Sequence, residues 1–185
     1  MRLFFLEVIE MDEKDVILGN IFNRKSVREF TDRKVSEEDM KIILKAAMST
    51  PSAINLQPWE FIVFDDEETL EYMVDLHEYS KMFKTATAGI VVCGNMERTI
   101  DRYRQLWVQD CSASTQNILL ALEALGLGGV WLGIYPVSER CKKLTDYFNL
   151  PDNIVPFSVV ALGYPKNDDK PKDKWDESKV HWNKW

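Results

Sequence analysis

The chain has 185 residues and a formal net charge of −7, because 30 acidic side chains outweigh 23 basic ones. This length predicts one domain, residues 1–185, with a core that buries roughly 70% of the unfolded surface. The acidic balance argues against nucleic acid or an anionic membrane as a main partner, so we expect a small-molecule ligand.

Histidine and cysteine usage argues against a metal site. Only two histidines occur, His77 and His181, which makes a histidine-based metal centre or catalytic triad improbable on composition. The three cysteines, Cys93, Cys111 and Cys141, form no CxxC pair and no zinc spacing. Their odd number favours reduced thiols in a cytoplasmic protein over disulfides.

Apolar spacing predicts two helices in the first 50 residues. The first runs from Asp12 to about Asn23, and the second begins at Ser36, which resembles a capping-box residue, and ends near Ser49. The later elements are expected as a strand over 59–64, a helix over 67–83, a strand over 89–93, a helix over 106–125, a strand over 130–134, a helix over 138–148 and a strand over 157–162. This order predicts an α+β fold in which helices flank a central mixed or antiparallel sheet.

Two terminal segments stand apart from this domain. Residues 1–11 read as an N-terminal extension whose apolar run is too short for a signal peptide. The tail over 166–185 is charged but ends in Val180, Trp182 and Trp185, which are too apolar to remain uncovered. We therefore expect the tail to dock on another surface.

The loop between the second helix and the first strand has the composition of a binding loop. Pro51 and Pro58 fix the backbone at its ends, which leaves Ser52, Asn55 and Gln57 to offer donors and acceptors to a polar ligand. The alternative is a connecting loop in which the same side chains only satisfy the local backbone.

Two further segments each allow two interpretations. The run from Arg24 to Arg28 offers cations and a hydroxyl to a phosphate, or is a solvated helix end. The glycine-rich stretch from Gly126 to Gly133 suits a close ligand approach, or helix capping and tight packing. It contains neither GxGxxG nor a P-loop, so it is no nucleotide signature by itself.

Taken together, the order and spacing of three segments resemble the FMN-dependent nitroreductase family. These segments are 24–30, 51–59 and 126–133, and the closing stretches 161–165 and 174–182 also resemble that family. The resemblance implies an intertwined homodimer with a swapped C-terminal tail and one FMN at each end of the interface. It also implies electrons from NADH or NADPH, used by a ping-pong mechanism to reduce small acceptors such as nitroaromatics, quinones or flavins.

The resemblance also implies roles for individual residues, with the chemistry itself on the flavin N5 and no catalytic side chain. Arg24 and Ser26, with Lys25 between them, match positions near the phosphate, and Arg28 matches the pyrimidine edge. The alternative for Arg28 is a surface ion pair with Glu29 or Asp32.

The remaining implied contacts come from the loop, the glycine-rich stretch and the tail. In the tail, Lys174 stands where the family usually has a phosphate-binding arginine, which keeps the charge but loses the bidentate fork. The loop residues that match the second subunit's contribution are Pro51, Ser52, Ala53, Asn55 and Gln57. The residues that match the turn along the flavin N5 edge, and the start of the strand after it, are Gly128, Gly129, Val130 and Trp131.

Two other functions are compatible with these residues. One is a specialised family member, such as a flavin-destroying or dehalogenating enzyme, although the short segment 95–105 leaves little room for a substrate lid. The other is a flavin-binding dimer without enzymatic activity.

Overall fold

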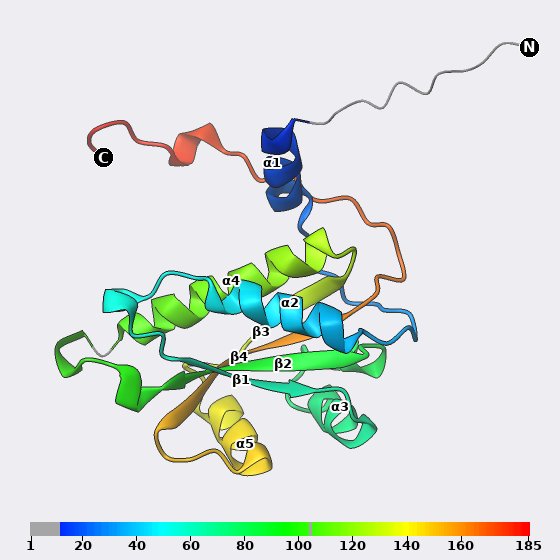
Figure 1. The fold of residues 1–185 in the computed structure, drawn as a ribbon, viewed down its shortest axis with the longest axis vertical. Coiled ribbons are helices and arrows are strands. Elements are labelled where there is room, and N and C mark those ends of the chain that lie inside the picture. The colour runs from blue at the N-terminus through cyan, green and yellow to red at the C-terminus, as the bar shows by residue number, and fades with distance from the viewer. Residues whose placement is uncertain (1–11, 104) are drawn as a thin grey trace, which may run out of the picture.

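The computed structural model describes residues 12–103 and 105–185, so the predicted N-terminal extension over residues 1–11 lies outside the described part. The helices and strands follow the predicted order along the chain (Figure 1). They are α1 (Glu13–Asn23), α2 (Glu37–Met48), β1 (Trp59–Phe64), α3 (Glu67–Val74), β2 (Ala88–Asn95), α4 (Leu106–Ala124), β3 (Gly128–Gly133), α5 (Ser138–Phe148) and β4 (Ile154–Gly163). Short 3₁₀ turns are η1 (Ala53–Asn55), η2 (Lys81–Lys84), η3 (Met96–Arg98), η4 (Asp101–Tyr103) and η5 (Glu177–Lys179).

The four strands form one sheet in the order β1-β2-β4-β3. All three strand pairs are antiparallel, so the antiparallel form of the predicted sheet is the one adopted. Helices α2 and α4 cover one face and α3 and α5 cover the other (Figure 1). The predicted α+β architecture, a central sheet flanked by helices, is confirmed.

Capping side chains fix where the helices begin. Ser36 Oγ accepts a hydrogen bond of 3.0 Å from Asp39 N, and its hydroxyl donates to Asp39 Oδ2 at 2.8 Å. Asp66 Oδ1 caps α3 in the same way, accepting from Thr69 N at 2.9 Å. Such caps satisfy backbone donors that no helical carbonyl can reach, which explains why the predicted starts of α2 and α3 are correct.

The predicted end of α3 is wrong. The helix was expected to continue to about Phe83 but ends at Val74. Ser80 Oγ donates to Val74 O at 3.0 Å and accepts from His77 N at 3.1 Å, and Tyr79 N donates to His77 Nδ1. These local side-chain bonds give the backbone an alternative to helical pairing, so the chain turns before resuming as η2.

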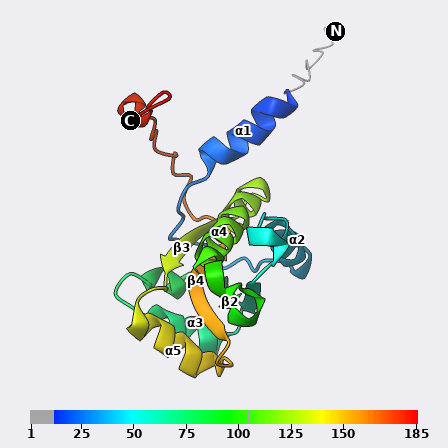
Figure 2. The same ribbon diagram turned by 90° about the vertical axis from the view of Figure 1, so that its left-hand side faces the viewer.

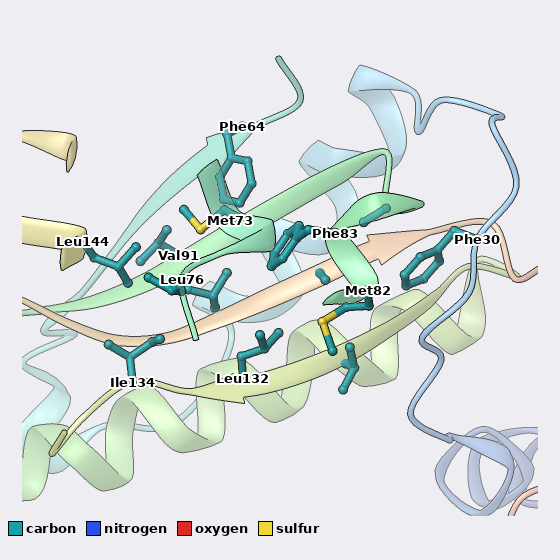
Figure 3. Packing of buried hydrophobic residues seen from close by; sticks show 14 of the residues in the cluster. Phe30, Phe64, Met73, Leu76, Met82, Phe83, Val91, Leu132, Ile134 and Leu144 are labelled. Atoms are coloured by element: carbon teal, nitrogen blue, oxygen red, sulfur yellow. The ribbon is translucent and has the colours of Figure 1, made fainter. Parts of the chain in front are cut away.

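Two apolar clusters hold the layers together, one on each face of the sheet. The cluster facing α3 and α5 includes Phe64, Met73 and Leu144 (Figure 3), and the one facing α2 and α4 includes Ile43 and Ile118. Outside residue 104, no helix between residues 12 and 185 combines the length and apolarity needed to cross a bilayer.

Helix α1 and the tail project from the same side of this layered body (Figures 1 and 2). No residue of α1 is buried, and Phe22 is 69% exposed. In the tail, Trp182 and Trp185 are also exposed. The end of α1 and the tail segment 171–175 line one cavity of about 560 Å³, so these two segments lie side by side.

Candidate functional site

The segment from Arg24 to Arg28 lies against the start of edge strand β3. Val27 N donates to Gly129 O at 3.0 Å, and Ser26 forms a parallel bridge with Gly129. Val27 itself is buried in the core, whereas Ser26 and Arg28 on either side of it are exposed. Successive residues of an extended chain face opposite sides, so the buried Val27 leaves Ser26 and Arg28 facing solvent.

Packing between protein groups explains why residues 128 and 129 are glycines. A Cβ on Gly128 would lie 2.6 Å from Val27 Cγ2, and one on Gly129 would lie 2.6 Å from Leu122 Cδ1. Both are inside β3, so the expectation that they form a turn is wrong. The tight-packing alternative holds here, because only a residue without a side chain lets the segment approach the strand so closely.

A strongly basic cavity opens beside this segment. It has a volume of about 480 Å³ and brings together residues from both ends of the chain. Six basic side chains face one carboxylate and one hydroxyl among its lining residues, which are Arg24, Lys25, Ser26, Arg28, Asp169, Lys170, Lys172 and Lys174. The predicted phosphate-site residues therefore meet in one cavity, whose donor set suits a dianionic phosphate.

Arg28 also lines a second cavity, of about 560 Å³, with Tyr79, Lys84 and Lys166. Among the described residues, Arg28 has no carboxylate partner, so the alternative of an ion pair with Glu29 or Asp32 does not occur. The Glu29 carboxylate instead accepts from Asn167 Nδ2 at 3.3 Å. Arg28 thus connects the basic cavity to a second open space.

Lys81, which was not singled out from the sequence, lies between two of these cavities. Lys81 lines the second cavity and a third one of about 470 Å³ that it shares with His77 and Arg140. Its ammonium group pairs with Asp75 Oδ1 at 2.7 Å. Burial, with a smaller contribution from Arg140, lowers the pKa of His77, whose ring is therefore neutral at physiological pH. The sequence signal for Lys81 was the group of charged residues within 78–84. The expectation of a helix that continues to about Phe83 hid this signal.

One edge of β3 carries backbone groups that are only partly paired. Within the sheet β3 pairs with β4, and on its other side the segment at Ser26 and Val27 covers Gly129, so the part of this edge beyond Gly129 carries carbonyl and amide groups without a strand partner. At its far end, Arg140 Nη1 donates to Gly133 O at 2.8 Å, and a Cβ on Gly133 would meet no atom within 4 Å. Val130 is a core residue and Trp131 packs on Phe157, so these two can reach a ligand mainly through their backbone.

The loop 51–58 follows the C-terminal end of α2 and lies far from the segments 24–28 and 169–174 that line the basic cavity (Figure 1). Its polar side chains are partly used within the loop: Ser52 Oγ accepts from Gln57 N at 2.9 Å, and Gln57 Nε2 donates to Asn55 Oδ1 at 3.1 Å. The expectation that these groups are all free is therefore wrong within one chain. Pro51 is exposed and Ala53 is half-buried, and one chain does not join the loop to the basic cavity.

One residue that anchors the loop escaped the sequence analysis. Asp110 on α4 is buried, and its Oδ1 accepts a hydrogen bond of 3.0 Å from Ala53 N. Burial raises the pKa of Asp110, and the Ala53 bond partly offsets that effect. The sequence signal for Asp110 is its spacing. It is an acidic residue on the same helix face as Ser114, Ile118 and Leu122, all of which are buried.

The arrangement combines donors for an anion with a strand edge that carries unpaired backbone groups. Within residues 12–103 and 105–185, no group of three histidine, cysteine or carboxylate side chains is placed to hold a metal ion. All three cysteines are free thiols, and burial raises the pKa of Cys93 to about 12, which leaves it protonated and a poor nucleophile.

Comparisons with known proteins concern the chain as a whole. The sequence model of the Nitroreductase family matches residues 21–77 and 75–164. A candidate NADH dehydrogenase/NAD(P)H nitroreductase of Archaeoglobus fulgidus is 48% identical over 171 residues, which cover 91% of this chain and 98% of the relative.

Two solved structures extend the comparison. A candidate NADH dehydrogenase/NAD(P)H nitroreductase of Bacteroides thetaiotaomicron superposes with a TM-score of 0.87 at 42% identity, covering 92% of this chain and 98% of its own. A candidate nitroreductase of Desulfovibrio desulfuricans, solved in complex with FMN, has a TM-score of 0.78 at 28% identity and covers 91% and 97%. The chain belongs to the nitroreductase family.

Proposed function

We propose that this protein is an FMN-dependent oxidoreductase that takes electrons from NADH or NADPH. The observation that carries the proposal is the basic cavity, where Arg24 and Ser26 meet Lys174 from the other end of the chain. A lone terminal phosphate matches this donor set, and the absence of a GxGxxG motif from the sequence argues against an adenine dinucleotide cofactor such as FAD. The FMN-bound relative and the nitroreductase relatives support the same assignment.

The chain's own residues bind and orient the cofactor. Arg24, Lys25, Ser26 and Lys174 line the basic cavity and would hold the phosphate, and the exposed Arg28, which lines this cavity and the next, would lie at the pyrimidine edge of the ring. The backbone from Gly128 to Trp131 provides donors and acceptors along the strand edge. In this proposal these residues position the cofactor and exchange no proton, because the redox chemistry belongs to the flavin.

When bound, FMN would supply the redox chemistry that connects NADH or NADPH to an acceptor such as a nitroaromatic, a quinone or a free flavin. Because the nicotinamide and the acceptor use the same open face in turn, we expect ping-pong kinetics. The fixed cation at Arg28 favours the reduced, anionic form of the ring.

The same proposal includes a homodimer in which each site uses two subunits. The loop residues Pro51 to Gln57 contribute to the flavin site of the partner, and the tail over 166–185 docks on the partner. The exposed apolar residues of α1 and the tail support this arrangement, because monomers rarely expose such surfaces without a partner. Light scattering at micromolar concentration should detect a dimer, and a folded, flavin-loaded monomer would contradict the shared site.

The cofactor assignment is tested by its identity and its contacts. The purified protein should be yellow, and heat extraction followed by chromatography should return FMN. Lys174→Ala should weaken FMN binding by about tenfold or more, since a hydrogen bond to a charged group contributes roughly 1.5–3 kcal/mol. Lys142→Ala is the matched control, because Lys142 pairs only with Asp146 on the surface of α5. Recovery of FAD, or of no flavin after reconstitution, would refute the proposal.

An acceptor screen separates this function from the two alternatives. Steady NAD(P)H oxidation with a nitroaromatic or quinone, together with anaerobic flavin spectra, identifies an oxidoreductase and excludes a flavin carrier. Turnover confined to a halogenated substrate, or loss of the flavin itself during turnover, would instead indicate a specialised family member. The donor preference follows from the same assay with NADH and NADPH in parallel.

A further inference from the structure

Asp110 connects the loop 51–58 to the body of the fold. It lies on α4, only 8% of its surface is exposed, and its Oδ1 accepts from Ala53 N at 3.0 Å. No lysine, arginine or histidine in the described chain lies within ion-pair distance of its carboxylate. A buried carboxylate whose hydrogen-bond partner is a loop amide is an expensive group to keep, so its bond to the loop needs an explanation.

The loop that Asp110 holds has an unfavourable backbone conformation. Ile54, Asn55 and Gln57 have φ values of +52°, +58° and +51°, in the left-handed region that side chains other than glycine rarely adopt. The conformation is least favourable for Ile54, because its side chain is branched at Cβ. The backbone must therefore be held in place by other contacts.

Burial within the chain does not explain the strained residue. Ile54 is 72% exposed, so its side chain gains little from its own subunit. The bonds from Gln57 to Ser52 and Asn55 lie within the loop and are exposed to solvent. The bond to Asp110 differs from them, because it joins the loop to the buried face of another element. The strained loop thus presents Ile54 and Asn55 outward from an anchor on α4.

We propose that Asp110 is a positioning residue that holds the loop 51–58 in the shape it needs at the flavin of the second subunit. This inference rests on the function proposed above, in which that loop completes the partner's FMN site. Asp110 does not touch the cofactor in this proposal. It acts through Ala53 N, and what it must supply is an acceptor oxygen rather than a charge.

Three variants test the anchor through the dissociation constant of FMN, measured by fluorescence quenching. Asp110→Ala removes the acceptor and should raise the dissociation constant at least tenfold, whereas Asp110→Asn keeps an acceptor oxygen and should stay within threefold of the wild type. Asp66→Ala is the matched control, because Asp66 accepts a comparable bond from Thr69 N on α3, at the opposite face of the sheet. It should lower the melting temperature and leave FMN affinity unchanged.

The donor side of the bond provides an independent variant if Asp110→Ala does not fold. Ala53→Pro removes the amide hydrogen, and Ser52 before it already has the extended backbone that precedes proline (φ −137°, ψ 158°). It should weaken FMN as Asp110→Ala does, and the double variant should be no weaker than either single variant. An Asp110→Ala dimer with wild-type FMN affinity, or an Asp110→Asn as weak as Asp110→Ala, would overturn the anchor.

Wild-type measurements separate this inference from the function on which it rests. If the wild-type dimer binds FMN and the affinity of both Asp110→Ala and Ala53→Pro is unchanged, only the anchor is refuted. If the wild type binds no FMN after reconstitution, the proposed function fails and the anchor fails with it.

Discussion

Replacing Gly128 with alanine tests whether the close approach of Val27 to β3 holds the proposed phosphate-binding segment, residues 24–28, in place. The added Cβ would lie 2.6 Å from Val27 Cγ2 and 2.7 Å from Val27 Cβ. Carbon atoms in favourable contact are about 3.5–4.0 Å apart, so the segment has to retreat by roughly 1 Å. Val27 N bonds to Gly129 O at 3.0 Å, so the same movement disrupts this bond and displaces Arg24, Ser26 and Arg28.

The expected size of the effect follows from these contacts. Overpacking a well-packed site typically costs about 1–3 kcal/mol. For a chain of this size each 1 kcal/mol lowers the melting temperature by roughly 2–4 °C, so we expect a decrease of about 2–12 °C. A displacement of about 1 Å also breaks a hydrogen bond to phosphate, which should raise the FMN dissociation constant about tenfold or more.

Calorimetry of the apoprotein and a fluorescence titration with FMN measure the two effects separately. Gly126→Ala is the control, because Gly126 has φ +69° and open space around its Cβ position. Its left-handed backbone costs an alanine about 1–2 kcal/mol, so stability should fall without any change in FMN affinity. A Gly128→Ala protein with unchanged melting temperature would refute the packing argument. Loss of stability at constant FMN affinity would show that Val27 does not position the phosphate site.

Three further predictions concern charge, the tail and the thiols. Arg28→Gln with FMN bound should lower the flavin midpoint potential by about 20 mV or somewhat more in a spectroelectrochemical titration, since an exposed cation at roughly 4 Å contributes about 1 kcal/mol; an unchanged potential would place Arg28 away from the ring. Deleting residues 174–185 should raise the FMN dissociation constant and lower the melting temperature. A truncated protein with the same two values as the full chain would show that the tail contributes neither to FMN binding nor to stability. Burial raises the pKa of Cys93 to about 12 and also raises that of Cys111, whereas unfolded thiols ionise near pH 8.5. Above about pH 8.5 the unfolded chain therefore loses thiol protons that the folded chain keeps, so the stability measured by urea unfolding should fall as pH rises. Removing Cys111 by alanine substitution should flatten that pH dependence, and an unaltered slope would contradict the assignment.

Local signals were sufficient to predict most of the fold. Asp66 caps α3 from its own side chain, and Ser36 does the same for α2, so residues close in sequence determine these helix starts. Strand β1 and helix α5 also occupy the predicted residues, because their apolar spacing is strong and turn residues border them. Such signals do not depend on what the segment packs against.

Some errors arose where contacts outside a segment decide its structure. Gly128 and Gly129 have the composition of a turn, but packing against Val27, which is remote in sequence, and against Leu122 on the preceding helix α4 makes them part of a strand. In the same way, the composition of the loop gave no sign of its bond to Asp110, because that residue lies on α4. Glycine composition cannot distinguish contact with a ligand from contact with protein, since both require a missing side chain. The early end of α3 differs, because hydrogen bonds among residues 74–80 cause it.

In the proposed dimer, a site divided between two subunits couples cofactor binding to assembly. Within one chain, the loop 51–58 lies far from the segments 24–28 and 169–174 that line the basic cavity (Figure 1), so in the proposed dimer it is the second copy that brings a loop to each phosphate site. A ligand that binds the assembled form alone stabilises it by about 2.7 kcal/mol per site at a concentration of 100 times its dissociation constant. FMN should therefore tighten the dimer, and dilution should release FMN and separate the subunits together. The exposed apolar residues of α1 and the tail then serve the active site as well as the interface, because they determine the concentration at which that site exists.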